Sequence, residues 1–310
     1  MQNSSVGNQT YSQRSMYAKL GSPEADQAGF LALLGGLDRL CEGVELCTGL
    51  MPNGFGPYDG HGGRNLSSKM NTPHDVVAVH TSLAELEDGT KYQQLTSWMN
   101  EIGATHAVNA WADPVNDLGG IEGKQQVNTS VARAYVDRLI TIGRKLRADG
   151  MDFSLHNHHP EFYLQVDGKP FITYMLNLSK PGDLDGEYLF VQLDTAWALA
   201  GGYDPAQFLI DFPGRVIGIH AKDIKFSGEG WGLEKSFMPL GQGDLKDVNP
   251  EVVEAAKADP KVRGVSYEQD FHGRDKNNNL IPDPDGIGLA DPMRNAVISL
   301  THLNDLVENS

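Results

Sequence analysis

Cysteine is scarce in this sequence: Cys41 and Cys47 are the only two among 310 residues. They do not form a CxxC pair and there is no second cysteine cluster, which excludes a cysteine-based zinc site. We expect both thiols to be reduced and buried in or near one strand.

Long apolar runs are also missing. No run reaches the ~18 apolar residues that suggest a membrane-spanning helix. Residues 1–14 are polar, rich in Asn, Gln and Ser, and lack the apolar centre of a signal peptide. We therefore expect a flexible N-terminus over residues 1–14 and a cytoplasmic protein that does not associate with membranes.

Basic residues are few relative to acidic ones. The chain has 25 Lys and Arg against 41 Asp and Glu, a formal net charge of −16. Nucleic-acid binding depends on Lys and Arg that neutralise phosphates, so this balance argues against a nucleic-acid partner. It is compatible with a metal site that is rich in carboxylates.

Short apolar runs alternate with longer amphipathic ones along the chain. The strands that we predict are Met16–Leu20, Gly43–Cys47, Val76–Thr81, His106–Trp111, Phe153–His158, Leu189–Asp194, Val216–Lys222 and Val262–Gln269. Helical apolar stripes fill the gaps, for example Val127, Val131, Tyr135, Leu139, Ile142 and Leu146. Such alternation indicates parallel strands with helical crossovers.

Eight such units predict an α/β fold, a (β/α)8 TIM barrel, as one domain over residues 1–310. An open doubly wound sheet is the alternative. The sequence contains neither a GxGxxG motif at a strand–helix junction nor a P-loop, the usual marks of nucleotide sites in such sheets.

Two long loops follow predicted strands. Residues 50–72 contain five glycines, and residues 272–288 contain an Asn run and two prolines. Loops of this length in a compact domain are usually functional or disordered, and loops after strands form the active-site face of a barrel. We expect both to be walls or lids of the site; either could instead dock a partner subunit.

Acids and histidines gather at the ends of four successive predicted strands. The residues are Glu161 shortly after the fifth strand, Asp194 at the end of the sixth, His220 in the seventh and Glu268 in the eighth. Singly, each could be a helix cap, a core histidine or a surface carboxylate. Together they predict one divalent metal site, because strand ends converge in a closed barrel. Mn²⁺, Mg²⁺, Co²⁺ or Zn²⁺ would suit such donors.

Residues 150–272 resemble the xylose isomerase-like superfamily, which includes the sugar phosphate isomerases and epimerases. Five motifs carry the resemblance in order: LHNHHPEF, VQLDTAWALAGGYDP, RVIGIHAKD, PLGQGD and VSYEQD. The N-terminal third matches more loosely, through Gly43–Leu46 and Ala78–Thr81. The resemblance implies the same barrel and a Glu–Asp–His–Glu set of metal ligands.

Carried onto this chain, the resemblance gives Asp194, His220 and Glu268 as ligands, with Mn²⁺ as the favoured ion. The fourth ligand is Glu161 or a strand-five histidine, His156 or His158. Period-two alternation puts these two histidines on one strand face. A histidine that is not a ligand can donate or accept a proton near neutral pH.

Further side chains lie at other predicted strand ends. Lys222 follows His220 on the same face, where it could bind a substrate oxygen or stabilise an enolate, or form a salt bridge to a neighbouring acid. Trp111, His80 and Trp197 could stack on a sugar ring or simply pack in the core. Glu45 could form a hydrogen bond within the barrel rather than act in catalysis.

The function that we predict is isomerisation or epimerisation of a keto-sugar or related small-molecule carbohydrate, in which His156, His158, Glu161, Glu268 and Lys222 are the candidate catalytic residues. The alternative is a lyase that uses β-elimination: a keto-inositol dehydratase, or a C- or O-glycoside deglycosidase acting on a 3-keto-glycoside, with or without a partner subunit. An apurinic endonuclease shares the superfamily but disagrees with the negative charge, and a non-enzymatic binding protein is the remaining reading. Nothing in the sequence decides whether the chain forms a homo-oligomer.

Overall fold

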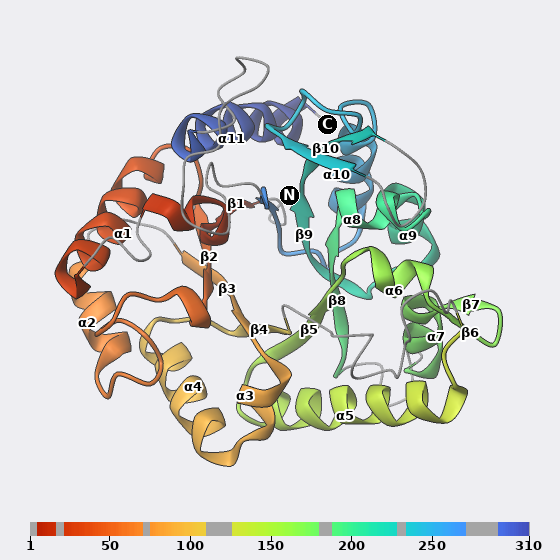
Figure 1. The fold of residues 1–310 in the computed structure, drawn as a ribbon, viewed down its shortest axis with the longest axis horizontal. Coiled ribbons are helices and arrows are strands. Elements are labelled where there is room, and N and C mark those ends of the chain that lie inside the picture. Colours follow the sequence, from red (N-terminus) through yellow and green to blue (C-terminus); the bar gives the residue numbers. More distant parts are fainter. Residues whose placement is uncertain are drawn as a thin grey trace.

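A closed ring of eight parallel strands forms the centre of the structure (Figure 1). The computed structural model describes residues 5–16, 22–70, 75–109, 126–179, 188–227, 234–270 and 291–309. The barrel strands are β1 (Ser5–Gln9), β2 (Gly43–Cys47), β3 (Asp75–Thr81), β4 (His106–Asn109), β5 (Asp152–His156), β8 (Phe190–Asp194), β9 (Val216–Ala221) and β12 (Gly264–Tyr267). Because β1 pairs in parallel with both β12 and β2, the sheet has no free edge, and the predicted (β/α)8 barrel is confirmed.

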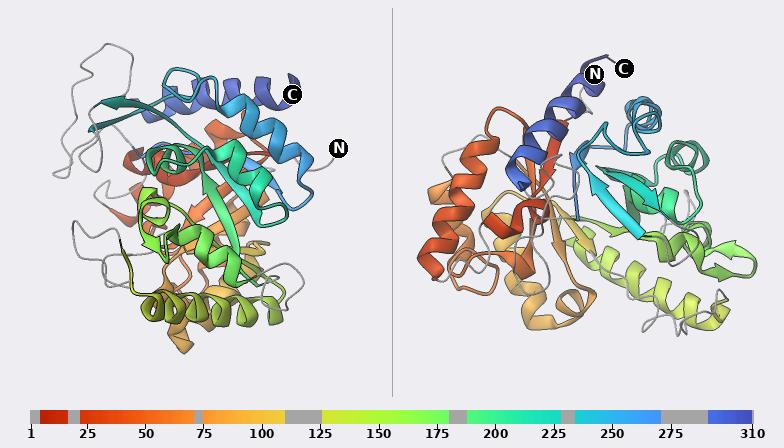
Figure 2. Two further views of the ribbon diagram at one scale, coloured as in Figure 1. Left: turned by 90° about the vertical axis from the view of Figure 1, so that its right-hand side faces the viewer. Right: turned by 45° about the horizontal axis from the view of Figure 1, so that its top comes forward.

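Helices surround this ring, as Figures 1 and 2 show from three directions. They are η1 (Thr10–Met16), α1 (Pro23–Leu37), η2 (Thr48–Leu50), α2 (Gly62–Lys69), α3 (Leu83–Glu87), α4 (Gly89–Glu101), α5 (Thr129–Ala148), α6 (His159–Tyr163), α7 (Phe171–Leu178), α8 (Thr195–Ala200), α9 (Pro205–Asp211), α10 (Asn249–Ala258) and α11 (Pro292–Asn309). Two antiparallel hairpins are added, one formed by β6 (Gln165–Val166) and β7 (Lys169–Pro170), the other by β10 (Asp223–Ser227) and β11 (Glu234–Met238). In the described part of the chain, no helix has the length and apolar character needed to cross a membrane.

Local sequence sets where these helices begin and end. Asp88 starts α4 by accepting hydrogen bonds from the backbone N–H groups of Thr90 and Lys91, two of the groups that a helix N-terminus leaves without partners. Gly103 and Gly150 follow α4 and α5 with φ angles of 75° and 80°. Glycine adopts this left-handed conformation at little cost, so each helix can turn back into the next barrel strand.

The apolar core lies between the barrel and its helices. Alternate residues of the strands, such as Leu46, Leu155 and Leu193, are fully buried in this core. The residues between them are also buried but polar, as Glu45 and Gln192 are. Because successive side chains of a strand point to opposite faces, the interior of the barrel is lined by polar groups.

The strand register places chemically active residues side by side. Asp194 at the end of β8 pairs with His220 of β9, and His156 at the end of β5 pairs with Gln192 of β8. His220 also pairs with Ser266 of β12, two positions before Glu268. The barrel thus brings residues from separate parts of the sequence to one end of the strands.

The first predicted strand is wrong. Met16 ends the 3₁₀ helix η1, residues 17–20 lie outside the described part, and the first barrel strand is β1, inside the segment that was expected to be a flexible N-terminus. This strand reads SVGNQ and lacks an apolar run, because Asn8 and Gln9 are buried among polar groups. At Gly7, a Cβ atom would lie 2.4 Å from the Oγ atom of Ser266, so a larger residue in β1 would require the Ser266 hydroxyl to move.

Candidate metal centre and active site

Four donor residues meet at the C-terminal end of the barrel strands. They are His156, Asp194, His220 and Glu268, and one donor atom of each lies within 4.8 Å of the others. All four are buried, and each comes from a different strand or from the residue that directly follows it. The structure therefore brings together three of the four ligands expected from the sequence, with His156 as the strand-five donor.

Glu161 does not belong to this group. It is the third residue of α6, and its Oε2 atom accepts a hydrogen bond of 2.9 Å from the backbone N–H of His158. Its Oε1 atom is buried and has no hydrogen-bond partner. Burial raises the pKa of the Glu161 carboxyl to about 8. In this arrangement, Glu161 caps the helix that follows β5 and stands apart from the four donors.

The orientation of Asp194 is fixed from two sides. Its Oδ1 atom accepts from the backbone N–H of Trp197, which makes Asp194 the N-cap of α8. Its backbone N–H and C=O form a reciprocal pair of hydrogen bonds with the Asn157 side chain, at 2.9 and 3.3 Å. The remaining oxygen, Oδ2, faces the other donors and lies 3.9 Å from the Nε2 atom of His156.

Lys222 is the cation of this cluster. Its Nζ atom lies 2.8 Å from Asp194 Oδ2 and 2.9 Å from both Glu268 Oε2 and Asp270 Oδ2. Although burial alone lowers it, these three carboxylates hold the pKa of Lys222 well above its usual value. Of the two roles expected for Lys222, the structure shows the ion pairs. Asp223 is not one of its partners, because that carboxylate accepts from four backbone N–H groups instead.

Glu45 lies at the centre of a second set of contacts inside the barrel. Its Oε2 atom is 2.8 Å from His220 Nε2, 2.9 Å from His80 Nε2 and 2.9 Å from Gln192 Nε2. The Oε1 atom of Gln192 in turn lies 3.1 Å from His156 Nδ1. Sequence alternation could have found Gln192, which precedes Asp194 by two residues on the same strand face, but no motif identified it.

A cavity of about 400 Å³ opens beside the four donors. Its lining consists of Gln9, Cys47, His80, His156, His158, His159, Pro160, Trp197, Glu268 and Asp270. One wall is aromatic, since the ring of His159 stacks on Trp197 at a centroid distance of 5.2 Å. His158 lies against the same indole, and burial followed by the charge of Lys222 lowers its pKa to about 3.

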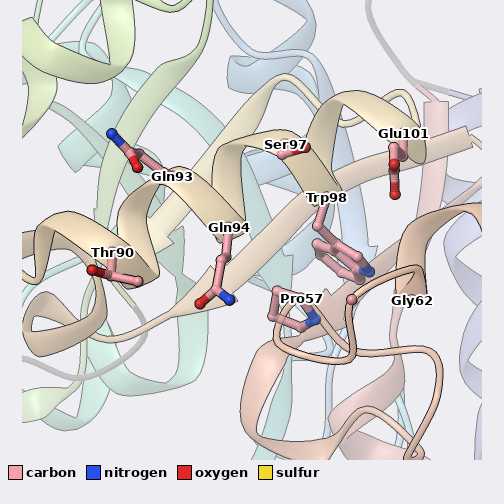
Figure 3. Close-up of a pocket in the computed structure, with 9 residues that line it drawn as sticks. Pro57, Gly62, Thr90, Gln93, Gln94, Ser97, Trp98 and Glu101 are labelled. Atoms are coloured by element: carbon pink, nitrogen blue, oxygen red, sulfur yellow. The ribbon is translucent and has the colours of Figure 1, made fainter.

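The first of the two long loops lies elsewhere. Within residues 50–70, Phe55 and Leu66 are buried in the core, and the Trp98 indole N–H donates to the carbonyl of Phe55 at 2.8 Å. Figure 3 shows the surface groove of about 260 Å³ that the loop forms with α4. The described part of this loop contributes nothing to the lining of the barrel-mouth cavity, so its expected role as a wall is not supported. Trp111 and the loop 272–288 lie outside the described residues.

The donor chemistry fits a divalent metal ion. Two imidazoles and two carboxylates form a mixed nitrogen and oxygen set that suits Zn²⁺, Co²⁺ or Mn²⁺ better than it suits the harder Mg²⁺. His220 Nε2 contacts Glu45 and His156 Nδ1 contacts Gln192, and metal-bound histidines usually have the nitrogen that does not bind the metal held in this way by a carboxylate or carbonyl oxygen.

Comparison with known proteins supports the fold. No family model and no curated protein matches this sequence. Among solved structures, a sugar phosphate isomerase/epimerase from Parabacteroides distasonis is similar over 100% of this chain and 95% of its own, with a TM-score of 0.65 and 16% identity. The IOLI protein with a bound zinc atom is similar over 98% of both chains, at 0.64 and 12%. The probable 3-DHS dehydratase AsbF from Bacillus anthracis is similar over 99% of this chain and 100% of its own, at 0.62 and 15%. The chain thus has the barrel fold of the xylose isomerase-like proteins, as the sequence predicts.

Proposed function

We propose that this protein is a divalent-metal-dependent enzyme that isomerises or epimerises a keto-sugar or a related carbohydrate. The observation that carries the proposal is the group His156, Asp194, His220 and Glu268, four buried donors beside a cavity of about 400 Å³. The similarity to a sugar phosphate isomerase/epimerase and to a zinc-containing protein of the same fold supports it.

A bound divalent ion supplies Lewis-acid polarisation of a substrate carbonyl, which acidifies the neighbouring C–H bond. The protein's own groups then position the substrate and carry the proton. The stacked pair of Trp197 and His159 offers a flat wall for a sugar ring. Glu268 and His158 both line the cavity and are the groups that we assign to proton removal and return. Lys222 contacts the same oxygens of Asp194 and Glu268 that face the other donors, and so holds both carboxylates in position.

The cavity favours a substrate without a phosphate group. Its described lining contains no Arg and no Lys, and it includes the carboxylates of Glu268 and Asp270. Phosphate recognition depends on cationic side chains or on backbone N–H groups at a helix N-terminus. Two cations lie beside the described lining: Lys222 pairs with three carboxylates, and the Arg14 guanidinium donates to the carbonyl of Asp270. We therefore propose a neutral carbohydrate substrate.

One specific feature also favours the lyase reading. The strand-five donor is an imidazole, so the centre lacks the pair of glutamates on opposite strands that a symmetric proton exchange would use. In β-elimination, one group removes the proton next to the carbonyl and another protonates the leaving oxygen. Glu268 and His158 could divide these roles, and the similarity to a probable dehydratase is in line with this.

A substrate panel tests these proposals directly. Keto-sugars, keto-inositols and 3-keto-glycosides, with matched phosphorylated sugars, are incubated with the Mn²⁺-loaded enzyme and with the chelated enzyme. Products of unchanged mass indicate isomerisation or epimerisation, and loss of water or of an aglycone indicates a lyase. Full turnover by verified metal-free protein would contradict the metal dependence, and preference for a phosphorylated sugar would contradict the proposed substrate class.

A further inference from the structure

The carboxylate of Glu45 contacts His220 of the four-donor group directly and reaches His156 through Gln192, although Glu45 is not a member of that group itself. It lies in the middle of β2, on the opposite side of the barrel from β8 and β9 in the strand order, and it is buried. A single oxygen, Oε2, accepts hydrogen bonds of 2.8–2.9 Å from side-chain nitrogens of His80, Gln192 and His220. An oxygen that already accepts three hydrogen bonds has little capacity left for a metal ion.

The contact with His220 is direct. A carboxylate oxygen only accepts, so the Nε2 atom of His220 must carry the proton that it donates to Glu45. In the metal-free protein, Nδ1 likewise donates to Glu268 Oε2 at 2.8 Å, so both ring nitrogens carry protons. A bound metal ion would displace the Nδ1 proton, because Glu45 retains the Nε2 proton and Nδ1 is the nitrogen beside Glu268 in the donor group. Glu45 thereby fixes the tautomer in which the inner nitrogen of His220 can bind a metal ion.

The contact with His156 passes through Gln192. The amide nitrogen of Gln192 must face Glu45, because two acceptors cannot bond to each other, and this turns the amide oxygen toward His156. His156 then donates from Nδ1, and its Nε2 lone pair faces Asp194 Oδ2 at 3.9 Å. Because Glu45 fixes the orientation of the Gln192 amide, it also fixes which nitrogen of His156 carries the proton.

We infer that Glu45 is a positioning residue that sets the tautomer and orientation of both imidazole donors, directly for His220 and through Gln192 for His156. This inference rests on the proposed metal site and assigns Glu45 no contact with the substrate. It requires that one ion binds per chain, since Glu45, His80 and His220 also lie close enough to hold an ion of their own.

The experiment measures metal affinity instead of turnover. Wild-type protein and the variants Glu45→Gln, Gln192→Leu and His80→Asn are stripped of metal and titrated with Zn²⁺ and Co²⁺ against a chromogenic chelator. Glu45→Gln keeps the shape of the side chain but replaces one carboxylate oxygen with an NH₂ group that donates hydrogen bonds. Gln192→Leu removes the hydrogen-bonded link between Glu45 and His156. His80→Asn is the matched control, because His80 contacts the same oxygen but is outside the four-donor group.

We expect Glu45→Gln to weaken metal binding about 10–100-fold and Gln192→Leu about 10-fold, the range typical of losing a hydrogen-bond partner of a metal ligand, with His80→Asn remaining within about 3-fold of wild type. The Co²⁺ absorption spectrum should change in the first two variants and persist in the third. In the double variant, the loss should be smaller than the two single losses combined, because Gln192 acts through Glu45. Circular dichroism and thermal unfolding of the metal-free proteins check folding; if Glu45→Gln does not fold, Gln192→Leu decides.

Unchanged affinity in both Glu45→Gln and Gln192→Leu, or an equal loss in His80→Asn, would overturn the inference. A wild-type stoichiometry of two ions would overturn it as well, because Glu45 would then be a ligand. Failure of the proposed function has a different signature: wild-type protein that binds no divalent ion, or binds one and turns over no carbohydrate.

Discussion

Replacing Glu161 with glutamine should stabilise the metal-free protein, by an amount that grows with pH. Glu161 is fully buried, one of its oxygens has no hydrogen-bond partner, and burial raises its pKa to about 8. In the unfolded chain, a glutamate titrates near pH 4.3. The folded protein therefore loses stability as the pH rises between these two values, because the carboxyl must either stay protonated or ionise in a buried site.

The magnitude follows from the width of this window. Each pH unit between the two pKa values costs about 1.4 kcal/mol, so the full window limits the effect to about 5 kcal/mol. Glutamine has the shape of the protonated glutamate, and its amide oxygen can accept the same hydrogen bond from the backbone N–H of His158. We expect Glu161→Gln to match wild type near pH 4.5 and to exceed it in free energy of unfolding by about 3–4 kcal/mol at pH 7.

Urea unfolding of the chelated proteins at pH 5, 6, 7 and 8 measures this difference. Glu161→Leu serves as the comparison, since it also removes the charge but loses the hydrogen bond to the helix N-terminus. A difference that does not vary with pH, or a glutamine variant less stable than wild type at pH 8, would refute the reasoning. Metal titration of the same protein decides the role of Glu161: unchanged affinity agrees with His156 as the fourth donor, and a large loss would make Glu161 the ligand.

Four further predictions concern the site and its supports. His158→Asn should lower turnover about 10²–10⁴-fold while the metal content persists, measured by steady-state kinetics and metal analysis; near-normal turnover would assign proton transfer to carboxylates alone. Asp223→Ala should lower the free energy of unfolding by about 3 kcal/mol or more, because four buried backbone N–H groups lose their acceptor; urea unfolding within 1 kcal/mol of wild type, on the order of a single hydrogen bond, would contradict this. Arg215→Met should destabilise the protein by about 2–4 kcal/mol, since the buried guanidinium donates to the carbonyl oxygens of Leu176 and Leu189 and no other donor replaces it; unchanged thermal unfolding would show that these acceptors find other partners. Chelation should lower the thermal stability, and re-addition of Mn²⁺ or Zn²⁺ at 100 times Kd should restore about 2.7 kcal/mol; a melting temperature that ignores both treatments would speak against the metal site.

The barrel could be predicted from the sequence because most of its strands carry an outward apolar face. Residues such as Leu46, Leu155 and Leu193 pack against helices, and they give their strands the apolar content that reveals them. The first strand lacked this signal, since Asn8 and Gln9 are buried by hydrogen bonds and close strand contact rather than by apolar packing. The sequence alone does not reveal such a strand. It is recognised in the structure because β1 closes the barrel between β2 and β12.

The fourth donor could not be settled from the sequence because two different signals overlap after β5. The resemblance to known barrels favours a glutamate at the end of the fifth strand, and Glu161 is the glutamate that follows this strand most closely. The structure places Pro160 in the first turn of α6 and Glu161 at the position where a glutamate reaches back to the helix N-cap. Proline followed by glutamate is a sequence signal for a helix start, and it could have moved the choice to His156.

Charge explains why the ion pairs of Lys222 do not replace a metal ion. The described centre contains four carboxylates, those of Glu45, Asp194, Glu268 and Asp270. Lys222 contacts the last three, His220 links Glu45 to Glu268, and Lys222 is the only lysine in these contacts. One ammonium group leaves an excess of negative charge in a buried region, where unpaired charges are costly. Protonation of His220 between two carboxylates can relieve part of this excess, and burial raises the pKa of Asp194 to about 6 against the opposing effect of Lys222. A divalent ion would relieve it without protonating any ligand, so the same carboxylates whose charges are costly in the metal-free barrel would favour binding of the proposed metal ion.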